Sequence, residues 1–330
     1  MVLSVLSGAL QEVLRPRIAL IEERLRDAVS QSDALADATS HHLVDAGGKR
    51  LRPALTLLAA QLGDGARPEV IDAAVVVELT HLATLYHDDV MDSATTRRGA
   101  PAAHQVWGNS VAILTGDLLF ARASRVVAGL GPAAVRIQAE TFERLCLGQL
   151  HETVGPTPGD DPVQHYLQVL ADKTGSLIAT SARFGAMFAG CDLTTVQQVT
   201  NYGEAAGVAF QLADDVIDIR SDAALTGKTP GTDLREQVAT MPVLLLRRRV
   251  AAGGADEDRD LLAAIDGDLS DDGVLASVVA RLALHPVVDE TAALAREWSY
   301  QAVGAIANLP EGEVKSSLIS FAEALVARTA

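Results

Sequence analysis

Apolar residues recur at intervals of three and four positions along most of this chain, which is the spacing of one face of an α-helix. Proline at the start of a segment and glycine after its end mark several boundaries, as at Pro68 and Gly63. No segment alternates apolar and polar residues as a half-buried strand would. The pattern predicts an all-α fold, with helices over about residues 10–46, 52–62, 68–92, 110–130, 133–151, 163–190, 194–220, 237–251, 261–266, 274–284, 287–307 and 311–327.

The predicted helices follow one another without a linker that would separate two domains. A loop rich in proline and glycine occurs at residues 155–162, but it does not divide the chain into halves. We therefore expect one domain over residues 1–330, built as a helical bundle.

The early residues and the apolar stretches indicate where the protein resides. Glu12 and Arg15 come early and no basic stretch precedes an apolar one, so no secretory signal is expected. The apolar stretch at residues 71–86 contains charged positions such as Glu78, so no transmembrane helix is expected. The two cysteines lack CxxC spacing, which indicates neither a disulfide scaffold nor a zinc site. Together these features predict a cytoplasmic protein.

The charge balance limits the ligands that the surface attracts. With 43 acidic and 27 basic residues the net charge is −16, which disfavours a nucleic-acid-binding protein. An acidic protein that binds anionic ligands needs local clusters of basic residues or bound cations. The sequence offers candidates for both.

Two segments have the form DDxxD, at residues 88–92 and 214–218. On a helix the first and last aspartates of such a motif are four positions apart and share a face. Grouped carboxylates suit Mg²⁺, which prefers oxygen ligands and is completed by water and substrate phosphates. A solvated acidic face would be a competing explanation for one motif. Both motifs, however, lie among apolar residues, where uncompensated charge is costly, so the pair indicates metal binding.

Basic residues gather at four places beside glycine or hydroxyl side chains. Residues 47–53 read Gly-Gly-Lys-Arg-Leu-Arg-Pro, and Arg97-Arg98 follow the first aspartate motif. Lys173-Thr174 and Lys228-Thr229 each join a lysine to a threonine. Arginine binds phosphate through two parallel hydrogen bonds, and glycine lets the backbone close on an anion. The pattern predicts two diphosphates, one held through metal ions and one by lysine and arginine.

In the order and spacing of these motifs, from about residue 40 to 245, the chain resembles the trans-isoprenyl diphosphate (polyprenyl) synthase family. The resemblance implies a helical bundle around a deep central cavity, of the isoprenoid synthase type, and a homodimer. It implies a Mg²⁺-dependent prenyltransferase that condenses isopentenyl diphosphate with an allylic diphosphate to give an all-trans polyprenyl diphosphate. Three Mg²⁺ ions per active site are expected. Because a long prenyl product dissolves in membranes, transient membrane contact is expected at product release.

The resemblance also assigns roles to the matching positions of this sequence. The metal ligands would be Asp88, Asp92, Asp214 and Asp218. The catalytic residues would be Asp88, Asp89, Asp92, Lys173, Asp214 and Asp215. Isopentenyl diphosphate would be held by Lys49, Arg52, His81 and Arg98. The allylic substrate would be contacted by Arg97, Lys173, Thr174, Gln211 and Lys228.

One position departs from the family pattern. Val238 stands where the family commonly has a lysine, which removes one diphosphate contact unless Arg235 replaces it.

In this family, product length depends on side chains five, eight or eleven positions before the first aspartate motif. Those positions are Ala83, Thr80 and Val77, which are spaced by three along one side of a helix. None is aromatic, so we expect a product of C30 or longer. The alternative is that these are small helix-packing residues and that another helix sets the limit.

Three other interpretations stay open: a C15 or C20 synthase, a class I terpene cyclase, and a non-catalytic partner subunit of a heteromeric synthase. The second DDxxD motif and the cluster at residues 47–53 favour a two-substrate transferase over a cyclase. Both complete aspartate motifs argue against a non-catalytic subunit, although Val238 keeps that interpretation open. Activity of the isolated chain would distinguish them.

Overall fold

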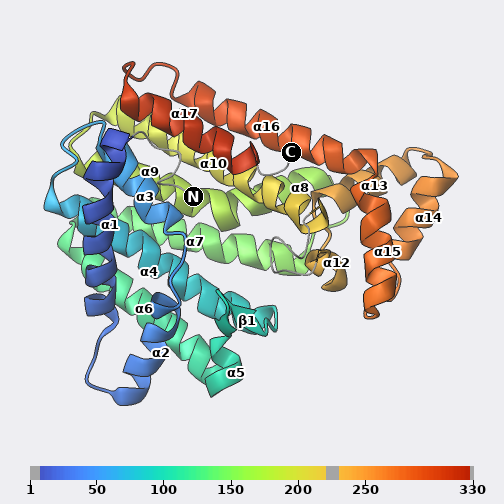
Figure 1. The fold of residues 1–330 in the computed structure, drawn as a ribbon, viewed down its shortest axis with the longest axis horizontal. Coiled ribbons are helices and arrows are strands. Elements are labelled where there is room, and N and C mark those ends of the chain that lie inside the picture. Colours follow the sequence, from blue (N-terminus) through green and yellow to red (C-terminus); the bar gives the residue numbers. More distant parts are fainter. Residues whose placement is uncertain (1–7, 221–229, 328–330) are drawn as a thin grey trace. The chain divides into compact units, whose positions relative to one another are not determined.

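A computed structural model of the protein describes residues 8–220 and 230–327, and their regular structure is almost entirely helical (Figure 1). The predicted all-α fold is confirmed. Contacts between residues divide the described chain into two compact units. Unit 1 comprises residues 8–145, 176–203 and 305–321, and unit 2 comprises residues 146–175, 204–220, 230–304 and 322–327. The expectation of a single domain stays a prediction.

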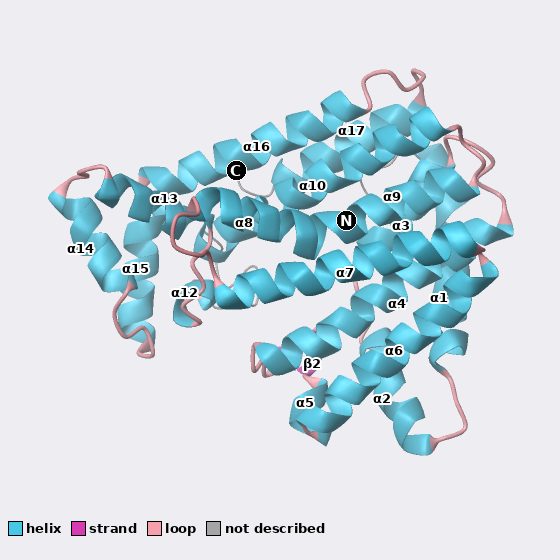
Figure 2. Ribbon diagram, turned by 180° about the vertical axis from the view of Figure 1, so that it is seen from behind, coloured by secondary structure: helices cyan, strands magenta, loops and turns pink. Residues whose placement is uncertain are grey.

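Unit 1 contains most of the N-terminal helices and one small hairpin. Its elements are α1 (Gly8–Val29), α2 (Ala34–Asp45), α3 (Leu51–Ala60), α4 (Pro68–Met91), β1 (Thr96–Arg97), β2 (Ala100–Pro101), α5 (Ala103–Trp107), α6 (Asn109–Gly129) and α9 (Ser176–Phe188). It also holds parts of α7 (Pro132–Val154), α10 (Leu193–Arg220) and α17 (Glu313–Val326). Within this unit α4 packs beside α6 and α3 packs beside α9, as both ribbon views show (Figures 1 and 2).

The central helix of unit 1 is α4, which is buried over most of its length. Successive residues such as Val75, Val76 and Val77 are all buried, so the helix has apolar neighbours on every side. Among the described residues it is the one helix long and apolar enough to cross a membrane, yet 72% of its most apolar 18-residue window is buried inside the protein. Its composition is that of a core helix.

A two-stranded hairpin follows α4, where the sequence predicts no strand. Thr96 pairs with Pro101 and Arg97 pairs with Ala100 in antiparallel register. The turn between them is Arg98-Gly99, and both residues have positive φ, at 54° and 80°. That conformation matches the twist of a tight hairpin. The hairpin therefore places Arg97 at the end of its first strand and Arg98 in its turn.

Two helices that the periodicity predicts as continuous are interrupted. The break between α1 and α2 comes at residues 30–33, where the side chain of Asp33 caps α2 by accepting from the backbone N–H of Ala36. The other break is a π-helical turn, Ala171–Gly175, between α8 (Pro162–Leu170) and α9. Such turns are frequent at functional sites, and this one carries Lys173 and Thr174.

Unit 2 is a second helical cluster with its own apolar core. Besides α8 and the π turn it contains α12 (Thr232–Arg235), α13 (Met241–Ala251), α14 (Asp256–Ile265), α15 (Asp272–Ala283) and α16 (Pro286–Ala305). Its core joins the C-terminal half of α10, at Leu212 and Val216, to Leu246 of α13 and Val287 of α16. The second aspartate motif lies at this end of α10, so core packing fixes the helix that carries it.

Candidate active site

The loop before α3 brings a glycine pair against an arginine of the hairpin. Gly47 and Gly48 have φ values of 78° and 148°. A Cβ atom on Gly48 would lie 2.8 Å from Cζ of Arg98, and the φ of Gly48 is one that other residues rarely adopt, so glycine suits this position. Nη1 of Arg98 donates to the carbonyl oxygens of Leu43 (3.0 Å) and Gly47. Arg98 thus connects the hairpin to the loop at residues 47–52 by a hydrogen bond.

Arg50 is the buried member of this group and has internal partners. Its guanidinium donates to Oε1 of Glu22 (2.6 Å), to Oε1 of Glu78 (2.8 Å) and to the carbonyl oxygen of Val44 (3.0 Å). Oε1 of Glu78 also lies 3.8 Å from Nη2 of Arg98. Because both acids balance its charge internally, Arg50 supports the loop and is not itself presented to a ligand.

Arg52 and His81 share the electrostatic field of this group. Burial lowers the pKa of Arg52 to about 10, so it remains charged at neutral pH, and its Nε has no hydrogen-bond partner among the described residues. Burial, reinforced by the positive charges of Arg52 and Arg98, holds the pKa of His81 well below its usual range. His81 is therefore a neutral hydrogen-bonding group. Lys49 is exposed beside them. These four cations and His81 (Lys49, Arg50, Arg52 and Arg98, with His81) are called the basic cluster below.

The first aspartate motif ends α4, and its members differ in environment. Asp89 is fully buried, and its Oδ1 accepts from Nε of Arg97 at 2.6 Å, while its Oδ2 is buried without a partner among the described residues. Burial raises the pKa of Asp89 and the charge of Arg97 opposes that shift. Asp88 is half-buried and Asp92 is exposed. The first and last aspartates are therefore the accessible ones.

The second motif repeats this arrangement in unit 2. Asp215 is 2% exposed, and its two carboxylate oxygens accept from the hydroxyl of Tyr166 at 3.1 and 3.0 Å. The backbone N–H of Met241 also donates to Oδ2, at 3.2 Å. Burial, together with the negative charge of Asp233, raises the pKa of Asp215 well above its usual range. Asp214 and Asp218 are only half-buried.

The π turn of unit 2 carries two predicted residues, Lys173 and Thr174, each of which has a side-chain partner on another helix. Nζ of Lys173 pairs with Oε2 of Glu152, and the hydroxyl of Thr174 donates to Oε1 of Gln211 at 3.3 Å. Gly148 of α7 lies against this turn, because a Cβ atom there would be 2.6 Å from the backbone nitrogen of Lys173. Gln211 precedes Asp214 by less than one helical turn, so the π turn and the second motif are neighbours.

The aspartate motifs suit metal ions that arrive with a substrate. In the described part of the chain no three His, Cys, Asp or Glu side chains converge closely enough to form a metal cage by themselves. Mg²⁺ needs few protein ligands, since it keeps several waters and is bound through one or two carboxylates plus substrate phosphates. The accessible first and last aspartates of each motif fit that requirement.

Comparisons with known proteins show the family of this chain. A sequence model described as "Polyprenyl synthetase" matches residues 33–282. The nonaprenyl diphosphate synthase of Mycobacterium tuberculosis is 42% identical over 318 residues, covering 96% of this chain and 93% of that protein. The chain belongs to the polyprenyl synthetase family. It is accordingly an enzyme, a prenyltransferase of the polyprenyl diphosphate synthase class.

Solved structures of the polyprenyl synthetase family share this fold. A polyprenyl synthase from Caulobacter crescentus CB15, complexed with calcium and isoprenyl diphosphate, has a TM-score of 0.87 and 31% identity over 97% of both chains. A geranylgeranyl pyrophosphate synthase from Corynebacterium glutamicum, also complexed with calcium and isoprenyl diphosphate, has a TM-score of 0.86 and 40% identity over 98% of both chains. The isoprenoid synthase fold that the motifs imply is thus confirmed.

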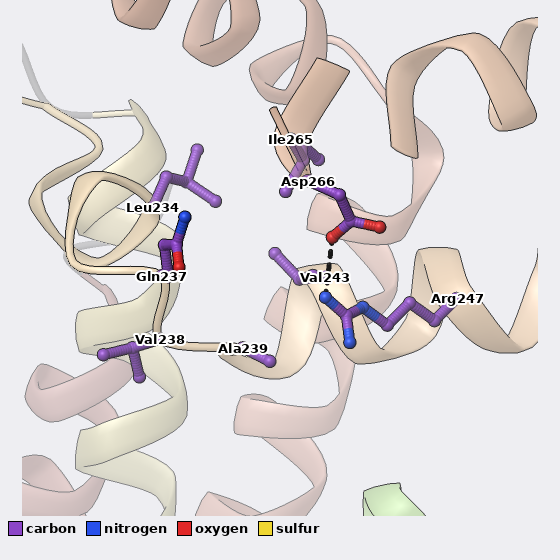
Figure 3. A pocket seen from close by; sticks show the side chains of 8 residues that line it. All are labelled: Leu234, Gln237, Val238, Ala239, Val243, Arg247, Ile265 and Asp266. Carbon is purple, nitrogen blue, oxygen red and sulfur yellow. Dashed lines mark hydrogen bonds and ion pairs between the residues drawn. The ribbon is translucent and has the colours of Figure 1, made fainter. Parts of the chain in front are cut away.

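Val238, the departure from the family pattern, lies on the segment that joins α12 to α13 (Figure 3). With Ala239 and Val243 it lines a cavity of about 160 Å³, at which Arg247 and Asp266 form an ion pair of 2.7 Å. Arg235, the residue that could replace the missing lysine, forms an ion pair with Asp272 of α15. Lys228, another predicted contact, lies outside the described residues.

The three positions expected to govern product length lie on α4 and are buried. Val77 and Thr80 are each 1% exposed and Ala83 is fully buried. The hydroxyl of Thr80 donates to the carbonyl oxygen of Val76 in its own helix, so its hydrogen-bond donor is satisfied there. All three side chains are small, so none of them places a bulky group on this side of α4.

Several residues of the site escape sequence reasoning because their partners are distant in the chain. Tyr166 lies 49 residues from Asp215, and Glu152 lies 21 residues from Lys173. Glu78 had a signal of its own, since a carboxylate inside an apolar helical stretch requires a buried counterion. Tyr166 and Glu152 carry no comparable local signal.

Proposed function

We propose that the protein is a Mg²⁺-dependent synthase that adds isopentenyl diphosphate to an allylic diphosphate. The observation that carries this proposal is the repeated environment of the two aspartate motifs. In each, the middle aspartate is buried and held by an internal donor, Arg97 or Tyr166, while the first and last aspartates stay accessible. A merely solvated acidic face would not need an internal donor for each middle residue.

In this proposal the accessible aspartates of the two motifs, Asp88, Asp92, Asp214 and Asp218, bind Mg²⁺ ions that carry the allylic diphosphate. The crystallised relatives named above hold calcium with isoprenyl diphosphate, which supports a divalent cation for this chain. The expected number of three ions rests on the family resemblance. Asp89 and Asp215 orient the motifs through Arg97 and Tyr166, so their role is positioning.

Four members of the basic cluster, Lys49, Arg52, His81 and Arg98, would hold isopentenyl diphosphate, and Arg50 would support their loop. Arg52 and Arg98 supply positive charge, and His81 supplies a hydrogen bond without adding charge. Lys173, Thr174 and Gln211 would contact the allylic substrate, and the pairing with Glu152 orients the ammonium of Lys173. When bound, Mg²⁺ would neutralise the charge that develops on the departing diphosphate. The protein's own task is to hold both substrates in reacting positions and to exclude water.

A transfer assay with matched aspartate variants tests this function. Purified protein, Mg²⁺, an allylic diphosphate and labelled isopentenyl diphosphate should give labelled prenyl product, and chelation of the metal should abolish it. Asp92→Asn should lower kcat by about 100-fold or more, because it removes an accessible metal ligand. Asp72→Asn, on the same helix but far from the motif, should retain activity. Transfer that persists in the chelated protein or in Asp92→Asn would refute the metal-dependent mechanism.

We further propose a product of C30 or longer. The small side chains at Val77, Thr80 and Ala83 and the 42% identity to a nonaprenyl synthase support it, whereas the Corynebacterium glutamicum relative is named for a geranylgeranyl product. Ala83→Phe should shorten the product, because an aromatic ring would fill the space five positions before the motif. An unchanged product length in a folded Ala83→Phe protein would contradict this role.

We propose a homodimer as the active form, with the chain acting as one functional domain in the cytoplasm. Exposed apolar side chains on α5 and α6, Val106 (50% exposed), Ile113 (42%) and Leu114 (65%), support a protein contact there. Transient membrane contact at product release follows from the solubility of a long prenyl chain. The alternative of a non-catalytic partner subunit is rejected if the isolated chain is active.

A further inference from the structure

A buried tyrosine of α4 joins the first aspartate motif to the end of α2. Tyr86 precedes Asp88 by two residues, and its hydroxyl donates to the carbonyl oxygen of Thr39 and accepts from the backbone N–H of Leu43 at 3.2 Å. Those two groups are the partners that an uninterrupted helix joins by its i→i−4 hydrogen bond. The hydroxyl thus bonds to both groups of one turn of α2, which ties that turn to α4.

The same turn of α2 holds the arginine hairpin. The carbonyl oxygen of Leu43 accepts from Arg98, as does that of Gly47 just beyond the helix. Backbone carbonyls at a helix C-terminus carry partial negative charge and favour cations. His42, on this turn too, lies with Nε2 at 2.8 Å from the carbonyl oxygen of Pro101 and with its ring against Trp107.

We propose that Tyr86 is a positioning residue for the isopentenyl diphosphate site, acting through α2 on Arg98 and on the loop at residues 47–52. This inference rests on the proposed function, because it takes the basic cluster as the site of isopentenyl diphosphate. The hydroxyl fixes the turn of α2 whose carbonyls bind Arg98. His42 fixes the opposite strand of the same hairpin through Pro101.

Burial makes the hydroxyl hard to replace. Tyr86, Leu43 and Thr39 are all buried, at 0%, 0% and 2% exposure. Water therefore cannot take the place of a missing hydroxyl without opening the core. In Tyr86→Phe the N–H of Leu43 and the carbonyl of Thr39 are left to bond only to each other. The turn would then move relative to α4, and Arg98 would move with the carbonyls that hold it.

The test is Tyr86→Phe, which keeps the ring and removes only the hydroxyl. We expect the KM for isopentenyl diphosphate, and its calorimetric Kd measured without allylic primer, to rise about fivefold or more, as expected for loss of roughly one hydrogen bond. The KM for the allylic diphosphate should change by less than about twofold, because the pairing of Arg97 with Asp89 is not touched.

Tyr202→Phe is the matched control. Tyr202 is also fully buried in unit 1, and its hydroxyl donates to the carbonyl oxygen of Leu318 in α17 at 2.7 Å, so its bond is not to α2 or the hairpin. It should lower stability and leave both KM values unchanged. If Tyr86→Phe behaves like Tyr202→Phe, Tyr86 is merely structural and the inference is overturned.

His42→Phe keeps the inference testable if Tyr86→Phe fails to fold. It retains a ring beside Trp107 and loses the bond to Pro101, so it should weaken isopentenyl diphosphate binding in the same direction. Unchanged affinity in His42→Phe would then overturn the proposal. If the wild-type protein binds isopentenyl diphosphate but transfers nothing, the proposed function fails, and the Kd values of the variants alone decide the inference.

Discussion

Glu78 is a carboxylate inside α4 that lies between two arginines of the basic cluster. Its Oε1 is 2.8 Å from Nη1 of Arg50 and 3.8 Å from Nη2 of Arg98, and the residue is buried. We expect Glu78→Gln to lower the free energy of unfolding by about 1 to 3 kcal/mol, because it removes one of the two acids that balance the buried charge of Arg50 and leaves Glu22 as the other. Urea denaturation followed by circular dichroism measures the change.

Glu69→Gln provides the control on the same helix. Glu69 lies 3.8 Å from Arg67, and both side chains are more than 40% exposed, at 42% and 43%. A pair of this kind contributes less than about 1 kcal/mol. Equal losses of stability in the two variants would contradict the role given to Glu78.

His81 predicts a pH dependence whose sign follows from its environment. Burial and the neighbouring arginines hold the pKa of His81 below the ordinary 6.5, so the unfolded chain binds a proton that the folded protein does not. Stability then falls as pH drops below about 6.5. His81→Gln cannot take up this proton, so its unfolding free energy should fall less than that of the wild type between about pH 6.5 and 5. Urea titrations at each pH measure the free energy of unfolding. If it changes with pH equally in the two proteins, the pKa of His81 is not lowered in the folded state.

Among the helices, α7 makes a close contact with the π turn that carries Lys173 and Thr174. Gly148→Ala would place a Cβ atom 2.6 Å from the backbone nitrogen of Lys173, so the π turn has to shift. We expect a loss of about 1 to 3 kcal/mol in stability and a raised KM for the allylic diphosphate, measured by denaturation and steady-state kinetics. Gly304→Ala in α16, where a Cβ atom meets nothing within 4 Å, should be neutral or stabilising. A Gly148→Ala protein as active and stable as Gly304→Ala would contradict the close contact.

The helices themselves are largely predictable from the sequence, whereas their interruptions are not. The ends of α4 follow from Pro68 and from the polar run after Met91. The π turn at Ala171–Gly175 is hidden because residues 163–190 keep helical periodicity throughout, and the change of hydrogen bonding depends on contacts such as that of Gly148. The hairpin is missed because its strands are only two residues long.

For the candidate site, the sequence predicts which residues take part but not the environment of each. The motifs name residues of the right chemistry, but they do not distinguish Asp89 from Asp88, since that difference comes from Arg97 and from burial. Tyr166 and Glu152 come from other segments, and only the tertiary structure brings them to Asp215 and Lys173. The roles of the motif residues remain predictions for the variants above to test.

For the whole molecule, self-association is the property that the surface predicts. Leu114 of α6 is 65% exposed, and its neighbour Ile113 is 42% exposed. Adjacent exposed apolar side chains of this kind often mark a surface that contacts another protein. We expect the wild type to sediment as a dimer and Leu114→Glu to shift it towards monomer, because the introduced charge would be buried in the contact. Leu284→Glu, at a single leucine that is 89% exposed in unit 2, should leave the dimer intact. A dimer equally stable in both variants would place the contact elsewhere.

The most direct test of the whole account is the size of the product that the isolated protein makes. Purified chain would be incubated with Mg²⁺, labelled isopentenyl diphosphate and, separately, C10, C15 and C20 allylic diphosphates, and the dephosphorylated products would be sized. We predict Mg²⁺-dependent elongation that ends at C30 or longer. A product that stops at C15 or C20 would keep the prenyltransferase and refute the length argument from α4. No elongation with any primer, from folded protein, would contradict the proposed function itself.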